Sequence, residues 1–157
     1  MTKVLLIGYG NPGRLDDGLG PALAAEIEKA KIDGIDCDSD YQLTVEDAVD
    51  VHNHDVVIFA DADVSCESPF YFKKIFAGKS VSFSSHSINP RSLLALTKQI
   101  YNSETNAFVL GIRGYEFNEF GERLSAKAKN NLKKALEFII PKLGKKEFTE
   151  YPPNSNN

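Results

Sequence analysis

The 157-residue chain has few cysteines, no long hydrophobic run and no excess of basic charge. Its two cysteines, Cys37 and Cys66, are too few for a disulfide framework, and their spacing fits neither a CxxC redox pair nor a zinc ribbon. No segment approaches the roughly 18 apolar residues of a membrane-spanning helix, and the apolar run near the start is too short for a secretion signal. With 18 Lys and Arg against 22 Asp and Glu, the net charge of −4 disfavours binding to nucleic acid. We therefore expect a protein of the reducing cytoplasm with neither membrane nor nucleic acid as its partner.

The composition is that of an ordinary folded domain. Hydrophobic residues make up 42% and charged residues 25% of the chain, which excludes disordered and collagen-like classes. The length is that of one domain, which we place at residues 1–149. Residues 150–157 (EYPPNSNN) show no hydrophobic periodicity and are expected to form a mobile tail. We expect a monomer.

Short apolar runs alternate with amphipathic stretches along the chain. The runs at 3–7, 55–60 and 108–112 predict buried strands, 35–39 predicts a short strand, and 70–76, with its lysines, predicts an edge strand. Helical spacing of apolar residues predicts helices at 20–29, 45–51, 90–101 and 125–143. This alternation predicts a three-layer α/β/α domain whose mostly parallel, twisted sheet has about five strands, one of them an antiparallel edge strand.

The loop after the first strand carries the pattern G-x-G-x-x-G at Gly8, Gly10 and Gly13. A strand before it and a helix after it are the context of a dinucleotide fingerprint. However, Pro12 lacks the N–H that a phosphate cradle needs, and the acids at 16 and 17 would repel a pyrophosphate. The two acids favour a cation instead, although either could simply cap the following helix.

Asp61 follows the third predicted strand directly. Because ligands bind beyond the carboxyl ends of strands in such sheets, Asp61 and the glycine loop can face the same crevice. Asp63, two residues further on, is more typical of a turn. An alternative for Asp61 is the same turn-forming role.

Of the three histidines, only His86 lies in a polar loop that can reach this crevice. A histidine on the surface of that loop, without a function, is an equally good interpretation. His52 and His54 are interpreted as turn residues. With Asp16 or Asp17, Asp61 and His86, the chain offers oxygen and nitrogen ligands that suit a divalent first-row metal such as Ni²⁺, Zn²⁺ or Mn²⁺.

Several motifs together resemble the nickel-dependent hydrogenase maturation endopeptidases. They are LIGYGNP at 6–12, DDGLG at 16–20, FADA at 59–62, SHS at 85–87 and VLGI at 109–112, in the order and approximate spacing of that family. The resemblance implies a cytoplasmic protease, often grouped with aspartic-type endopeptidases. Its substrate would be the precursor of a [NiFe] hydrogenase large subunit, from which it removes a C-terminal extension after nickel insertion.

The resemblance also implies a site. The family's three metal-contacting positions fall on Asp17, Asp61 and His86, with Asp16 as the second choice for the acid of the loop. Many relatives have glutamate where this chain has the shorter Asp17. The nickel would belong to the substrate and serve for recognition, because three protein ligands bind a free ion weakly and leave positions for the precursor's thiolates. No organic cofactor is implied.

The chain offers no obvious nucleophile for peptide hydrolysis, since no G-x-S-x-G elbow is present and neither cysteine has a basic partner nearby in sequence. We therefore hypothesise that water attacks the scissile carbonyl, polarised by the metal or activated by Asp17 or Asp61. Two alternatives stay open: a dinucleotide-binding protein that uses Gly8, Gly10 and Gly13, and a nickel-binding or scaffold protein of the same fold without turnover. A third, peptidyl-tRNA hydrolase, has a similar glycine-rich opening but also an Arg-His-Asn element and a basic surface that this chain lacks.

Overall fold

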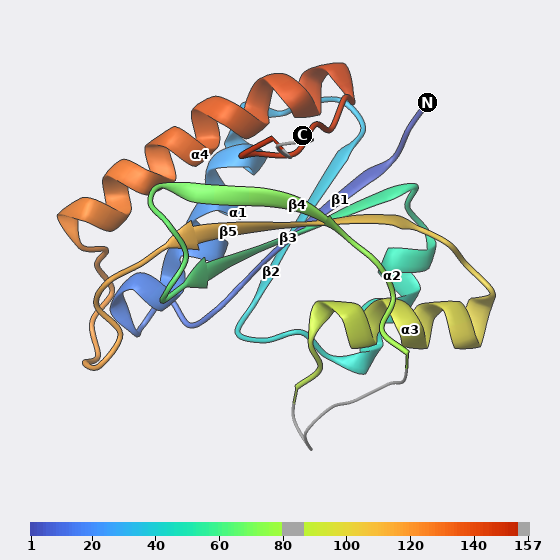
Figure 1. Ribbon diagram of the computed structural model, residues 1–157, viewed down its shortest axis with the longest axis horizontal. Helices are drawn as coiled ribbons and strands as arrows, with labels where there is room; N and C mark the ends of the chain where they lie inside the picture. The colour runs from blue at the N-terminus through green and yellow to red at the C-terminus, as the bar shows by residue number, and fades with distance from the viewer. Residues whose placement is uncertain (80–86, 154–157) are drawn as a thin grey trace.

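A five-stranded sheet in the order β2-β1-β3-β5-β4 forms the middle layer of the molecule (Figure 1). Its strands are β1 (Val4–Tyr9), β2 (Ile35–Asp40), β3 (Val56–Asp63), β4 (Phe70–Ile75) and β5 (Asn106–Arg113). Four of them are parallel, and β4 runs antiparallel to β5 at one edge. The structure, a computed structural model, describes residues 1–79 and 87–153. The predicted sheet, including its antiparallel edge strand, is confirmed.

Helices cover both faces of the sheet (Figure 1). Helices α1 (Leu19–Ala30) and α4 (Ala126–Lys145) lie on one face, and α2 (Ala48–His52) and α3 (Pro90–Tyr101) lie on the other. Two short 3-10 helices, η1 (Leu15–Gly18) and η2 (Val45–Asp47), precede α1 and α2. The predicted three-layer arrangement is therefore confirmed. Within the described residues, none of these helices combines the length and the apolar character that a membrane crossing requires.

The continuous apolar run of β1 is explained by burial on both faces. Val4 and Leu6 pack into the cluster beneath α1 and α4, whereas Leu5 and Ile7 pack into the cluster beneath α2 and α3. Alternate residues of a strand point to opposite faces, so a central strand between two helical layers needs apolar residues at every position.

The third strand is longer than the sequence predicted. We expected it to end at residue 60, but β3 continues to Asp63 and pairs with β5 over its whole length. Asp61 therefore lies within the strand, opposite Gly111, rather than in the loop that follows. The extension is possible because the end of β3 is only half-buried, so that its carboxylates stay accessible.

Residues 150–153, the described part of the segment that we expect to be a mobile tail, contact β4. Tyr151 exchanges two backbone hydrogen bonds with Phe72 of β4 and stacks on Phe70, with ring centroids 4.7 Å apart. The side chain of Glu150 accepts a hydrogen bond from the backbone of Lys74. These contacts cover part of the outer edge of β4. They depend on one aromatic residue, Tyr151, and a search for hydrophobic periodicity does not detect a contact of that kind.

Close packing of β1 against α1 depends on two glycines. A Cβ on Gly8 would lie 2.1 Å from the carbonyl oxygen of Gly20, and a Cβ on Gly20 would lie 2.5 Å from the carbonyl oxygens of Tyr9 and Ala60. These contacts are with backbone atoms, which cannot move aside without displacing the helix from the sheet.

We predict that Gly8→Ala lowers the free energy of unfolding by about 1–3 kcal/mol, because overpacking strains a close-packed contact. Gly144→Ala is the matched control. Gly144 lies in the last turn of α4 with no atom within 4 Å of the added Cβ. That substitution should raise the stability by about 0.5–1 kcal/mol. Urea denaturation of both variants measures the difference, and equal effects would contradict the packing role of Gly8.

Candidate functional site

The candidate site lies at the carboxyl ends of β1 and β3. Tyr9 is the last residue of β1, and Asp61 lies near the end of the neighbouring β3. The loop after β1 passes through η1, which carries Asp16 and Asp17, before α1 begins. The structure thus brings two of the predicted acids to one edge of the sheet.

Asp17 is fixed by the glycine loop. Its Oδ2 atom accepts a hydrogen bond of 2.7 Å from the backbone N–H of Asn11. Gly10 has φ of 138°, and a Cβ at this position would lie 2.1 Å from the carbonyl oxygen of Asp17. The loop therefore folds back onto Asp17, which requires glycine at position 10.

Asp61 is the acid with the strongest electrostatic perturbation. Burial, together with the nearby charge of Asp17, raises the pKa of Asp61 to about 7. The hydroxyl of Tyr9 donates a hydrogen bond to the Asp61 carboxylate, and burial raises the pKa of Tyr9 as well. A carboxyl group with a pKa near neutrality, next to a second acid, can carry or release a proton at physiological pH.

Asp16 has a structural role. It is fully buried, and its carboxylate accepts four hydrogen bonds: from the backbone N–H groups of Tyr115, Glu116 and Ser125, and from the Ser125 hydroxyl, at 2.7–2.9 Å. Burial acts to raise the pKa of Asp16, but these hydrogen bonds outweigh it and lower the pKa. With its oxygens engaged, Asp16 is unsuited to the metal contact for which it was the second choice. Neither it nor Asp17 caps α1, whose N-cap is Gly18 without a side-chain bond.

Asp63 forms the turn that its sequence context predicted. Its Oδ1 atom accepts hydrogen bonds from the backbone N–H groups of Ser65 and Cys66, both at 2.9 Å. The hydroxyl of Tyr71, on β4, also bonds to Asp63, and burial raises the pKa of Tyr71 to about 12. Asp63 thus shapes the end of β3 beside Asp61.

His86, the third predicted ligand, lies outside the described residues. The other two histidines make structural contacts. His52 stacks on Tyr101 with ring centroids 4.5 Å apart. His54 bridges the carbonyl oxygen of Asp50 and the carboxylate of Asp36, both at 2.6 Å. His54 lies in the short connection after α2, in agreement with its interpretation as a turn residue, whereas His52 is the last residue of α2 and not part of a turn.

A second group of acids was not singled out from the sequence. Ligand oxygens of Asp38, Asp47 and Asp50 lie within 4.8 Å of one another, a spacing that could accommodate a metal ion. Burial and the neighbouring aspartates raise the pKa of Asp47, whose carboxylate also accepts a hydrogen bond from the N–H of Thr44. The alternation of aspartates at 36, 38 and 40 in β2 was the available signal, but nothing in the sequence indicated that η2 and α2 would add two more.

The loop geometry does not suit a dinucleotide. The N–H of Asn11 is bound by Asp17, and the N–H of Gly13 is bound by the side-chain oxygen of Asn11 at 2.8 Å. Pro12 has no N–H. The backbone donors that would cradle a pyrophosphate are therefore engaged within the loop, and a carboxylate lies where the anion would have to lie.

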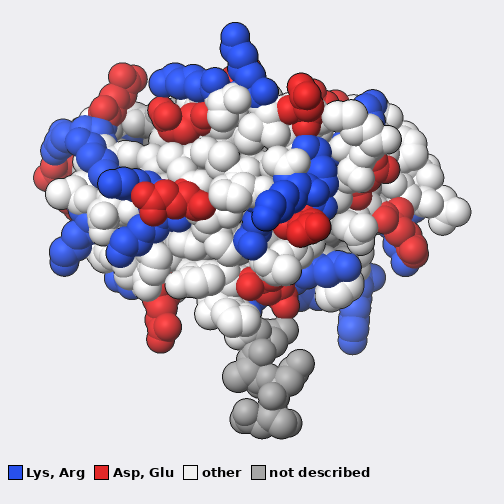
Figure 2. All heavy atoms as spheres, turned by 90° about the horizontal axis from the view of Figure 1, so that it is seen from above, with Lys and Arg blue, Asp and Glu red and all other residues white. Residues whose placement is uncertain are grey.

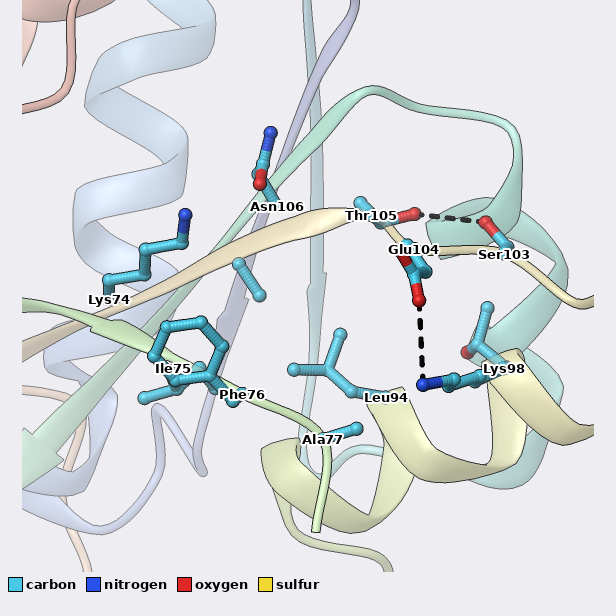
Figure 3. A pocket seen from close by; sticks show the side chains of 12 residues that line it. Lys74, Ile75, Phe76, Ala77, Leu94, Lys98, Ser103, Glu104, Thr105 and Asn106 are labelled. Carbon is cyan, nitrogen blue, oxygen red and sulfur yellow. Dashed lines mark hydrogen bonds and ion pairs between the residues drawn. The ribbon is translucent and has the colours of Figure 1, made fainter.

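Two cavities lie beneath α3. One, of about 340 Å³, borders Asp61 and Tyr9 and extends along β5 and β4. The other, of about 350 Å³, is shown in Figure 3, where Lys98 and Glu104 form an ion pair at its side. The latter contains Asn106 and Ala107, at the start of β5, and so lies at the opposite end of the sheet from Asp61. Only the first is continuous with the acids of the candidate site.

The surface seen in Figure 2 carries no continuous region of one charge. Lys and Arg are interspersed with Asp and Glu over this face of the molecule. A basic stripe of the kind that follows a nucleic-acid backbone is not seen there.

Comparison with solved structures finds close similarity of fold along nearly the whole chain. The hydrogenase maturating endopeptidase HybD from E. coli matches with a TM-score of 0.68 at 19% identity, covering 92% of this chain and 93% of that one. The [NiFe] hydrogenase maturation protease HycI from Thermococcus kodakarensis matches with a TM-score of 0.69, also at 19% identity and with the same coverage. An endopeptidase from Escherichia coli reaches 0.71 at 18% identity, covering 99% of both chains.

No protein-family model and no curated protein matches the sequence. At the identities found, the likeness to the solved structures is one of fold. The chain therefore has the fold of hydrogenase maturation proteases, as the sequence motifs led us to expect.

We predict that Asp16→Asn lowers the free energy of unfolding by about 2–3 kcal/mol at pH 7, because an amide cannot satisfy the donors that the carboxylate binds. Since the folded state lowers the pKa of Asp16, its stabilising contribution is present above the unfolded pKa of about 3.8. That contribution disappears as the pH falls through the folded value. Urea denaturation at pH 7 and pH 3 should show the gap between wild type and variant closing in acid. A gap that persists at low pH would contradict this role.

We also predict that Asp17→Asn lowers the pKa of Asp61 from about 7 toward its ordinary value, because the substitution removes the nearby charge. Carbon-13 NMR of the aspartate carboxyl groups in the metal-free protein measures this titration. Asp36→Asn, which removes a charge that does not act on Asp61, is the control. An Asp61 pKa that is equally high in both variants would show that Asp17 does not influence it.

Proposed function

We propose that this protein is an endopeptidase that removes the C-terminal extension of a [NiFe] hydrogenase large-subunit precursor after nickel insertion. The observation that carries the proposal is the juxtaposition of Asp17, from η1, and Asp61, from β3, in a fold shared along the chain with hydrogenase maturation proteases. We propose the cytoplasm as the location of the reaction.

In this proposal Asp17, Asp61 and His86 contact the nickel carried by the precursor. Carboxylate oxygens and an imidazole nitrogen are ligands that Ni²⁺ accepts, and the remaining coordination positions are filled by groups of the precursor. Cleavage then depends on nickel insertion, because the precursor without nickel lacks the atom that the three side chains recognise. The nickel is part of the substrate, and no organic cofactor is required.

Asp61 is suited to proton transfer during hydrolysis. In the proposed reaction its carboxylate accepts a proton from the water that attacks the scissile carbonyl and returns that proton to the leaving amine. Water adds to the carbonyl carbon, the C–N bond breaks, and a new carboxyl and a new amino terminus result. Tyr9, by donating to Asp61, keeps this carboxyl group in a fixed orientation.

The carboxylates of Asp38, Asp47 and Asp50, from β2, η2 and α2, form a separate acidic cluster. Asp38 and Asp50 are exposed, and none of the three is a cause of the raised pKa of Asp61. We therefore do not assign them to the reaction, and they provide the matched control for the experiment below.

We predict that the wild-type protein shortens a nickel-loaded large-subunit precursor and leaves the nickel-free precursor intact. Asp17→Ala, Asp61→Ala and His86→Ala should each lower the cleavage rate by about 10²–10⁴-fold, the usual loss when acid–base or electrostatic groups are removed. Asp38→Asn should cleave at the wild-type rate. Mass spectrometry of the precursor measures the released extension, and circular dichroism checks that each variant is folded.

The same experiment separates the alternatives. Nickel-dependent binding without shortening of the precursor would indicate a non-catalytic nickel-binding or scaffold protein. Unchanged cleavage in all three alanine variants would overturn the site assignment. Micromolar binding of NAD(H) in calorimetry would revive the dinucleotide alternative.

A further inference from the structure

The cavity that borders Asp61 continues away from the acids, between the sheet and the first turn of α3. Besides Asp61 and Tyr9, its lining includes Tyr71, Ile75, Pro90 and Val109. Its volume of about 340 Å³ is near the lower end of the range of small-ligand sites, and suits a side chain with its adjoining backbone.

One row of residues across the sheet creates this space. Asp61 pairs with Gly111 of β5, and Gly111 pairs in turn with Tyr71 of β4. A Cβ on Gly111 would lie 2.2 Å from Cε1 of Tyr71, so the tyrosine ring lies directly across the glycine. Because Gly111 has no side chain, the ring of Tyr71 can lie over it and form a wall of the pocket next to Asp61.

Toward the amino end of β5 the pocket has apolar residues in its lining. Val109 and Ile75 are partly buried hydrophobic residues packed beside the core beneath α2 and α3. They face the pocket together with Pro90, the first residue of α3. At the other end lie the carboxylates of Asp61 and Asp63. Asn89 and Arg91 also line the pocket, and the Nε of Arg91 donates a hydrogen bond to the carbonyl oxygen of Phe76. An apolar side chain would bury surface against Val109, Ile75 and Pro90, whereas an acidic side chain that reached the other end would meet Asp61 and Asp63.

We propose that this pocket binds the apolar side chain of the residue that directly follows the scissile bond, the first residue of the released extension. The inference rests on the proposed function. Its direction follows from the strand order: Asp17 comes from the loop after β1, whereas the pocket is formed by β5 and β4, on the opposite side of β3. In the proposed function the nickel-bearing part of the precursor lies at Asp17 and Asp61, so the chain that leaves Asp61 toward Val109, away from Asp17, is the extension.

The test varies the size of the first side chain of the extension and, separately, the size of the pocket. Nickel-loaded precursors are prepared with Leu, Ala, Trp or Asp as the first residue of the extension, and kcat/KM is measured for each. The wild type should prefer Leu over Asp by at least about tenfold, the order of discrimination that apolar pockets reach. Val109→Phe fills the pocket and should lower kcat/KM for the Leu precursor by about tenfold, while the value for the Ala precursor stays within about threefold.

Ile75→Ala changes the pocket volume in the opposite direction. It keeps the proposal testable if the Val109→Phe variant does not fold. It enlarges the pocket, so the ratio of kcat/KM for the Trp precursor to that for the Leu precursor should rise by about tenfold. Leu136→Phe, at a half-buried position of α4 on the other face of the sheet, is the control and should keep wild-type ratios.

The outcomes distinguish the two proposals. Opposite shifts in preference for Val109→Phe and Ile75→Ala support the pocket. If both variants cleave the precursors with the same preferences as the wild type, the assignment of the pocket is overturned, but the proposed function is not affected. If the wild type cleaves no nickel-loaded precursor, the proposed function fails and the pocket assignment fails with it.

Discussion

The arrangement of the site depends on the buried carboxylate of Asp16. Its hydrogen bonds tie η1 to residues 115–116 and to Ser125, whose side chain also accepts a hydrogen bond from Ala128 in the first turn of α4. One side chain therefore fixes the loop after β1 against the segment that follows β5. Because Asp16 points inward, its neighbour Asp17 is left at the half-buried edge where Asp61 lies. Consecutive acids thus have different tasks, one holding the backbone and the other available for chemistry.

A pair of half-buried carboxylates is unfavourable to folding unless something compensates them. Here the N–H of Asn11 binds Asp17, and the Tyr9 hydroxyl and the N–H of Ala62 bind Asp61. The remaining repulsion appears as the raised pKa of Asp61 rather than as displacement of the side chains. A cation at this edge would relieve the repulsion, so the electrostatics favour an incoming metal centre. The carboxylates that repel each other in the free protein would be satisfied by such a cation.

The sequence predicted most of the fold because its elements have strong local patterns. Apolar runs such as 4–7 and 56–60 fit only strands buried on both faces, and the alternation with amphipathic helices leaves few topologies. Contacts between residues far apart in the sequence could not be predicted from local patterns. The four donors that bind Asp16 come from residues about 100 positions away, so nothing near Asp16 indicated a structural role. The cluster of Asp38, Asp47 and Asp50 and the tether of Tyr151 to β4 also depend on tertiary contacts.

The glycine pattern explains why the dinucleotide alternative arose and why the geometry disfavours it. Gly8 permits the close contact of β1 with α1, and Gly10 permits the turn onto Asp17; both requirements concern the backbone. A strand–turn–helix of this kind leaves N–H groups that need an acceptor, and a phosphate can supply one from outside. In this chain the acceptor is internal, because Asp17 and Asn11 bind those groups. The loop therefore presents a carboxylate to the ligand instead of N–H groups, and the same backbone turn favours a cation where the dinucleotide proteins bind an anion.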